Sequence, residues 1–178
     1  MHIDVPTLET DRLILRAHRR EDFEAVHAMW QHPAIYTQIT GKPSTREQSW
    51  ARLLRYGGLW NMIGYGFWAL EEKVSRQFIG EMGFADFKRE IDPPFGDAPE
   101  MGWVLTPEVH GKGYGNEALS RVVSWGDTFF KQERALCIIS PDNAASLRIA
   151  EKNGFSKLLE TTYTEEPVIM LERRFRND

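Results

Sequence analysis

The chain has 178 residues, of which 42% are hydrophobic and 27% charged, a composition that excludes a disordered or fibrous protein. Its 22 basic and 26 acidic residues give a net charge of -4, so no overall positive field draws it to nucleic acid or to a membrane. The single cysteine, Cys137, excludes an internal disulfide and a thiolate metal cluster. We therefore expect one domain over residues 1–178, with neither nucleic acid nor membrane as a partner.

The amino-terminal segment carries acidic residues where a signal peptide needs an apolar run. Asp4, Glu9 and Asp11 interrupt it, so we expect a cytoplasmic protein. Residues 12–16, which have polar ends and an apolar centre, predict a first strand.

Two helices and a hairpin are predicted next. Residues 21–30 place apolar side chains at helical spacing, and Pro33 follows as a stop signal. Ser44 and Glu47 have the spacing of a capping box, which predicts a second helix ending near residues 57–58. The β-prone runs 66–71 and 78–84, joined by a short charged connection, predict an antiparallel hairpin.

The second half alternates strands and helices. After an irregular loop at residues 92–99, the sequence predicts a strand at 100–105, a helix at 116–130, a strand at 135–139, a helix at 144–153 and two strands within 155–174. Gly154 is the expected helix C-cap. The order predicts a mixed α/β fold of the α+β class, with about seven mostly antiparallel strands, one parallel pair and about four helices on both faces.

The predicted parallel strands bracket a glycine-rich segment, residues 110–116. Gly111, Gly113 and Gly115 allow positive φ angles and a close ligand approach, and the helix that follows directs free N–H groups toward an anion. Lys112 adds a positive charge. The spacing fits neither a dinucleotide fingerprint nor a Walker loop. A diphosphate-binding loop and an ordinary strand-to-helix turn both remain open on this pattern alone.

The segment resembles the coenzyme A loop of the GNAT superfamily of N-acetyltransferases, in which Gln or Arg is followed after two residues by Gly, one residue, and Gly or Ala. Gly113 and Gly115 match, whereas His110 replaces the Gln or Arg. Residues 9–16, and residues 143–146 with 151–155, are similar to the first strand and last helix of the branch that contains the ribosomal-protein N-terminal acetyltransferases.

The resemblance implies a V-shaped splay between the fourth and fifth predicted strands, and acetyl-CoA as co-substrate. It implies that strand backbone groups and Asn143 contact the pantetheine arm and that the loop amides hold the diphosphate. The implied cofactor contacts are Val104, Leu105, His110, Gly111, Lys112, Gly113, Tyr114, Gly115, Asn116, Asn143 and Ser146. Asn143 also has the position of a helix N-cap. The histidines lack metal-binding spacing, so we expect no metal.

Amine acetylation requires a base for the amine proton and a donor for the leaving sulfur. Glu100, which matches a glutamate of this branch, is the predicted general base, with Glu81 and Asp86 as weaker candidates. The tyrosine acid of many members would fall at Ala150, so Ser146 is the candidate donor. The alternatives are a solvent-facing or lysine-paired Glu100 and a serine bonded to its own helix backbone.

The resemblance implies that the acceptor is a primary amine, either a protein N-terminus or a small molecule. Neutralising an α-amine at pH 7 costs about 1 kcal/mol, against about 4 to 5 kcal/mol for a lysine side chain, so an α-amine is the easier acceptor. Trp68 and Trp103 are the predicted substrate-binding pair, although aromatic residues more often form core. A non-catalytic acyl-CoA-binding or sensing domain, a nucleotide-phosphate-binding module and a homodimer are left open.

Overall fold

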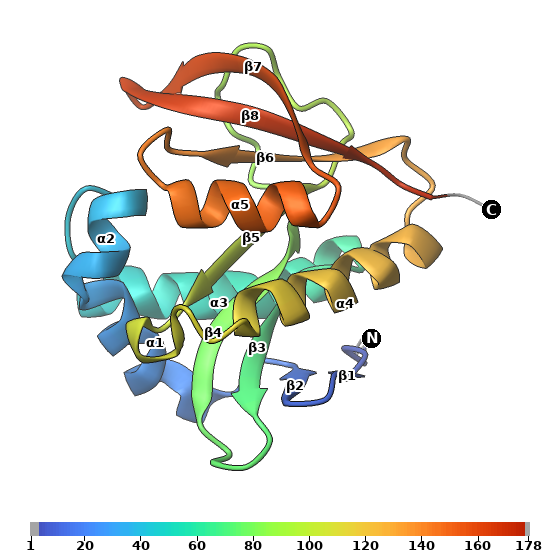
Figure 1. The fold of residues 1–178 in the computed structure, drawn as a ribbon. Coiled ribbons are helices and arrows are strands. Elements are labelled where there is room, and N and C mark those ends of the chain that lie inside the picture. Colours follow the sequence, from blue (N-terminus) through green and yellow to red (C-terminus); the bar gives the residue numbers. More distant parts are fainter. Residues whose placement is uncertain (1–3, 177–178) are drawn as a thin grey trace.

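The computed structural model describes residues 4–176, in which a single mixed sheet carries helices on both faces (Figure 1). The strand order is β1-β2-β3-β4-β5-β6-β8-β7, and every neighbouring pair is antiparallel except β5 and β6. The strands are β1 (Leu8–Glu9), β2 (Leu13–Arg16), β3 (Phe67–Glu72), β4 (Phe78–Ala85), β5 (Glu100–Leu105), β6 (Arg134–Ile139), β7 (Ser156–Tyr163) and β8 (Glu166–Arg174). The mostly antiparallel α/β architecture is as predicted, and the eighth strand is β1, which is too short to show an alternating pattern.

Within residues 4–176, five α-helices accompany the sheet, one more than predicted. They are α1 (Phe23–Gln31), α2 (Pro33–Ile39), α3 (Arg46–Ile63), α4 (Tyr114–Phe129) and α5 (Ala144–Lys152). The unpredicted helix is α2. Pro33 occupies its first turn, where the missing N–H costs nothing, and His32 Nδ1 accepts from the Ala34 N–H at 3.1 Å. Pro33 therefore begins α2 as well as following α1.

Helix α3 differs from the prediction at both ends. Its N-cap is Thr45, whose hydroxyl accepts from the Gln48 N–H at 3.2 Å, so the capping box lies one residue later than the predicted pair. The helix continues through Gly57 and Gly58, and it ends at Gly64, which has a φ of 81°. Burial of Trp60 beyond the glycines outweighs their low helix propensity, about 1 kcal/mol each.

The sheet separates two apolar layers. On one face, Leu119 and Val122 of α4 pack with Met82, Phe84 and other strand residues. Figure 1 shows α4 and α5 in front of the sheet and α3 behind it. On the opposite face, α1 and α3 bury a second cluster that contains Val26 and Leu53. Because side chains alternate along a strand, adjacent residues of one strand pack in different layers.

The connection between β4 and β5 is the longest loop, residues 86–99, and it is anchored rather than free. Ile91 packs against Leu136 and Met170, on the side of β6 and β8 away from α5. The Thr161 hydroxyl of β7 donates to the Asp92 carbonyl at 2.6 Å. This anchoring holds the loop beside the start of β5.

Candidate active site

The parallel strands β5 and β6 pair only where they begin. Glu100 lies opposite Leu136, whose N–H donates to the Pro99 carbonyl at 3.0 Å. Beyond that point β6 pairs with β8 along its whole length, while the two parallel strands diverge, as Figure 1 shows. The structure thus confirms the predicted splay. The diverging strands correspond to the fourth and fifth predicted strands. They are numbered β5 and β6 because the unpredicted β1 precedes them in the chain.

Strand alternation decides which backbone groups of β5 face this divergence. The Thr106 N–H donates to the Ile79 carbonyl of β4 at 2.9 Å, so the even-numbered residues direct their backbone groups to β4 and the odd-numbered ones toward β6. The backbone groups of Leu105 and Trp103 therefore face the divergence. Those of Val104 face β4, which does not suit the cofactor contact expected of that residue.

The glycine segment presents a row of free backbone donors. Gly111 and Gly113 have φ angles of 74° and 83°, in the left-handed region, and α4 begins directly afterwards at Tyr114. Within residues 4–176, none of the N–H groups of residues 111–116 donates a hydrogen bond. At the positive end of the α4 dipole, these donors form a site suited to an anion.

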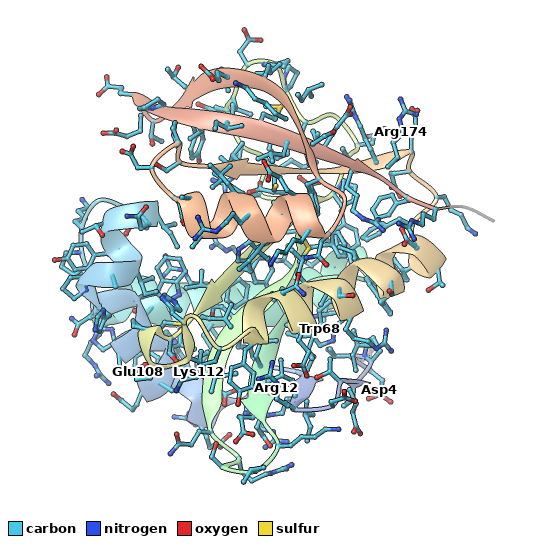
Figure 2. All side chains as sticks on the ribbon, viewed as in Figure 1. Asp4, Arg12, Trp68, Glu108, Lys112 and Arg174 are labelled. Carbon is cyan, nitrogen blue, oxygen red and sulfur yellow. The ribbon has the colours of Figure 1, made fainter. Side chains whose placement is uncertain are left out.

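Two side chains fasten the glycine segment to its surroundings. His110 Nε2 lies 2.8 Å from the Leu105 carbonyl, and since a carbonyl can only accept, Nε2 carries the proton. Arg12 Nη1 donates to the Lys112 carbonyl at 2.9 Å, while Arg12 Nε donates to Glu117 Oε2 at 2.7 Å. Figure 2 shows Arg12 and Lys112 next to each other below α4. The start of β2 and the first turn of α4 thus hold the loop between them.

Sequence reasoning missed the role of Arg12, because its partner lies 105 positions away in the chain. Glu117 also accepts from the Thr10 hydroxyl at 2.6 Å. Burial acts to raise the pKa of Glu117, but the hydrogen bonds from Thr10 and Arg12 outweigh it and lower that pKa. The Arg12 guanidinium lies 4.1 Å from the centre of the Tyr114 ring. An ionised Glu117 therefore fixes a cation beside the loop.

The start of α5 brings three predicted residues together. Asn143 is the N-cap, and its Oδ1 accepts from the Ser146 N–H at 3.1 Å. The Ser146 hydroxyl accepts from Trp103 Nε1 at 3.3 Å rather than bonding to its own helix. Ala150, where many family members carry tyrosine, is completely buried.

Glu100 lies where β5 and β6 meet, and it is 5% exposed. Its Oε2 accepts from Arg89 Nε at 2.6 Å, so the carboxylate pairs with an arginine rather than with a lysine or solvent. Burial raises the pKa of Glu100 above its usual value, although the hydrogen bond and charge of Arg89 oppose the shift. A cavity of about 250 Å³ reaches both side chains. A buried carboxylate of raised pKa beside a cavity is suited to accept a proton.

The two weaker candidates for the base are both held in other contacts. Glu81 is completely buried, and its Oε1 accepts from Trp30 Nε1 at 2.8 Å and from the Tyr56 hydroxyl at 2.6 Å. Asp86 pairs with Lys88 at 2.6 Å. A larger hollow of about 380 Å³ also touches Asp86 but none of the other predicted site residues.

Of the two tryptophans predicted to bind substrate, one lies in the core and the other lies at the site. Trp68 is completely buried, packs against Trp60 and Trp125, and donates from Nε1 to the Pro6 carbonyl at 2.7 Å. The expectation that Trp68 lines a substrate cleft is therefore corrected: it is a core residue. Trp103 is half-buried and contacts the Ser146 hydroxyl.

Residues 4–176 contain no helix that is both long and apolar enough to cross a membrane. The same residues contain no group of three or more His, Cys, Asp or Glu side chains placed to hold a metal ion.

A sequence profile of the GNAT acetyltransferase domain matches residues 12–156. The chain belongs to the GNAT acetyltransferase family. The match covers the splay, the glycine loop and α5. Together with the relatives described below, it identifies an acetyl-CoA-dependent N-acetyltransferase. The resemblance expected from residues 110–116 is thus confirmed at the level of the family.

Individual relatives agree with this assignment. The acetyltransferase is 30% identical over 154 residues to the uncharacterized N-acetyltransferase YoaA of Bacillus subtilis, covering 85% of this chain and 84% of that one. It is similar to the structure of a GnaT-family acetyltransferase from Bordetella pertussis, with a TM-score of 0.84, 29% identity and coverage of 95% and 99%. RimL, a ribosomal L7/L12 alpha-N-protein acetyltransferase solved with coenzyme A, shares the fold, with a TM-score of 0.78, 17% identity and coverage of 97% and 100%.

Proposed function

We propose that the loop at residues 110–116 and the divergence of β5 from β6 bind acetyl-CoA, and that the acetyl group passes to an amine held beside Glu100. The observation that carries this proposal is the row of backbone N–H groups at residues 111–116, which lack acceptors within residues 4–176. Because Gly111 and Gly113 carry no side chain, a diphosphate can come close to the backbone of the loop. Lys112 adds a positive charge at the edge, and Arg12, which is paired with Glu117, holds the Lys112 carbonyl.

The length of β5 supports the proposed placement of the pantetheine arm of acetyl-CoA. From Leu105 to Glu100 the strand extends about 17 Å, at about 3.3 Å per residue, comparable to an extended phosphopantetheine arm. The backbone groups of Trp103 and the N–H of Leu105 lie along this path and suit the amides of the arm, while the Leu105 carbonyl is bound by His110. Asn143 adds its Nδ2 donor, which has no partner within residues 4–176, while Oδ1 caps α5. An arm bound in this way ends near Glu100.

Glu100 is the proposed general base. Acetyl-CoA supplies the activated thioester, and the chain manages the protons. Glu100 takes the first proton from the acceptor ammonium and passes it to solvent, which leaves a nitrogen lone pair free to form the N–C bond. The raised pKa of the buried carboxylate makes it a stronger base than an exposed glutamate.

Ser146 is the proposed hydrogen-bond donor to the leaving sulfur. Its hydroxyl accepts from Trp103 Nε1, so its own proton is free to point elsewhere. When the C–S bond breaks, the sulfur leaves with the bonding electrons and takes the second proton lost by the nitrogen. The buried Ala150 offers no acid for this step, which favours Ser146.

The test is the release of free thiol from acetyl-CoA in the presence of a panel of amines: α-amino acids, their carboxamides, N-terminal peptides and polyamines. We expect thiol release that depends on the amine, with mass spectrometry showing one acetyl group added to it. Tight acetyl-CoA binding without transfer to any amine would instead favour a non-catalytic acyl-CoA-binding domain. Failure to bind acetyl-CoA would contradict the proposal altogether.

A further inference from the structure

The cavity beside Glu100 is lined by charged and aromatic side chains of the loop between β4 and β5. Asp86, Phe87, Lys88, Arg89, Phe95 and Glu100 contribute to its wall. It lies where β5 and β6 meet, at the opposite end of β5 from the glycine loop. On the proposed function, an acceptor bound here has its amine at Glu100. The side chains of this wall therefore help to determine which amine fits the cavity.

Arg89 is held rigidly in this wall. Its Nε donates to Glu100 Oε2 at 2.6 Å, and its guanidinium carbon lies 5.1 Å from the centre of the Phe87 ring and 4.8 Å from that of Tyr163. The side chain is 23% exposed. The guanidinium donates from Nε to Glu100 and also interacts with the Tyr163 side chain, which fixes it at the wall of the cavity. A guanidinium fixed in this way is a planar fork that binds carboxylates.

The charges around the cavity favour an acceptor that carries an anion. Lys88 and Asp86 pair with each other at 2.6 Å, and Arg89 pairs with Glu100, so the wall itself is balanced. Arg55 of α3 adds a further cation, with its guanidinium 4.6 Å from the centre of the Phe87 ring. The Asp97 carboxylate acts on Lys88, so the surroundings of the cavity carry both signs of charge. Paired opposite charges suit an acceptor that carries both an ammonium and a carboxylate.

We propose that the acceptor is a small amine that carries a carboxylate next to the nitrogen, namely an α-amino acid. Its carboxylate binds the terminal nitrogens of Arg89, and its ammonium meets Glu100. The contact between Arg89 and Glu100 makes the pair complementary to such a zwitterion, whose opposite charges are also adjacent. The inference rests on the proposed function, since Glu100 takes the proton, the N–C bond forms and the C–S bond breaks as described above.

A carboxamide of the same amino acid separates this idea from a general preference for α-amines. It keeps the side chain and the amine but lacks the negative charge that Arg89 recognises. Free α-amino acids and the matching α-carboxamides are assayed as acceptors, and the ratio of their kcat/KM values is compared between the native enzyme and Arg89→Leu. Loss of the partner of Glu100 alters the base for both acceptors equally, so the ratio isolates recognition of the carboxylate. Arg89→Lys is the matched control that keeps the charge but not the planar fork.

We expect at least one free amino acid to be acetylated in preference to its carboxamide, and Arg89→Leu to reduce that preference about 10- to 100-fold, the scale of a charge-assisted hydrogen bond. Arg89→Lys should fall between the two. Affinity for acetyl-CoA and the thermal midpoint of the variants show that they remain folded. Equal use of acid and carboxamide, an unchanged ratio in Arg89→Leu, or transfer only to peptides or polyamines overturns the inference and leaves the proposed function standing. Transfer to no amine at all overturns both.

Discussion

Replacement of Gly113 by alanine isolates the contribution of the loop conformation to acetyl-CoA binding. Gly113 has a φ of 83°, and an added Cβ would lie 3.4 Å from Arg12 Nη2, an ordinary contact with a movable side chain. Space therefore permits alanine, and only the backbone opposes it. A left-handed conformation costs an L-residue about 1 to 2 kcal/mol. The variant loop relaxes when free and must regain this conformation to direct its N–H groups at the diphosphate.

The expected result is an affinity for acetyl-CoA that is about 5- to 30-fold weaker, the equivalent of that conformational energy. Isothermal titration calorimetry measures it, and a thermal melt shows that the variant is folded. Gly41→Ala is the matched control, because Gly41 has a φ of 73° and its added Cβ would meet no atom within 4 Å. It should lose similar stability and retain native affinity. A folded Gly113→Ala protein with native affinity would refute the reasoning, as would an equal loss of affinity in the control.

Three further variants test the remaining parts of the site. Glu100→Gln should slow acetyl transfer about 100-fold or more at unchanged acetyl-CoA affinity. Because burial raises the pKa of this carboxyl, native activity should fall as the pH is lowered through that raised value, and the variant should lack this fall; an identical pH profile would exclude Glu100 as the base. Ser146→Ala should lower kcat up to about 10-fold without weakening acetyl-CoA binding, and full activity would exclude a role at the sulfur. Arg12→Leu removes the bond to the Lys112 carbonyl and should weaken acetyl-CoA binding about 2- to 10-fold with little effect on kcat, whereas a change in kcat alone would contradict a positioning role.

Local sequence signals predicted the parts of the site that depend on backbone conformation. The glycines at 111 and 113 have the positive φ angles that their residue type favours. Gly154 has a φ of 86° one residue beyond Asn153, which is the actual C-cap of α5. The crossover from β5 through α4 to β6 follows from the order of strand and helix patterns. Such features are set by residues close in sequence, so a single chain reveals them.

Features that depend on distant residues were not predictable in this way. Arg12 finds Glu117 only after folding, and Arg89 finds Glu100 because residues 86–99 turn back over the start of β5. The amphipathic pattern of a strand also leaves open which neighbour its backbone groups face, which is why Val104 was expected at the cofactor. A tryptophan in a central strand suits both core and cleft, and only the packing of Trp68 decides between them.

The most direct test of the account is a titration of isotope-labelled protein, followed by NMR of its backbone amides, with coenzyme A and separately with pantetheine. Pantetheine has the same arm but lacks the diphosphate. We predict that coenzyme A shifts the amide signals of residues 111–116 and that pantetheine binds far more weakly and leaves those signals in place. Binding of coenzyme A that leaves the signals of residues 111–116 unchanged would contradict the central claim.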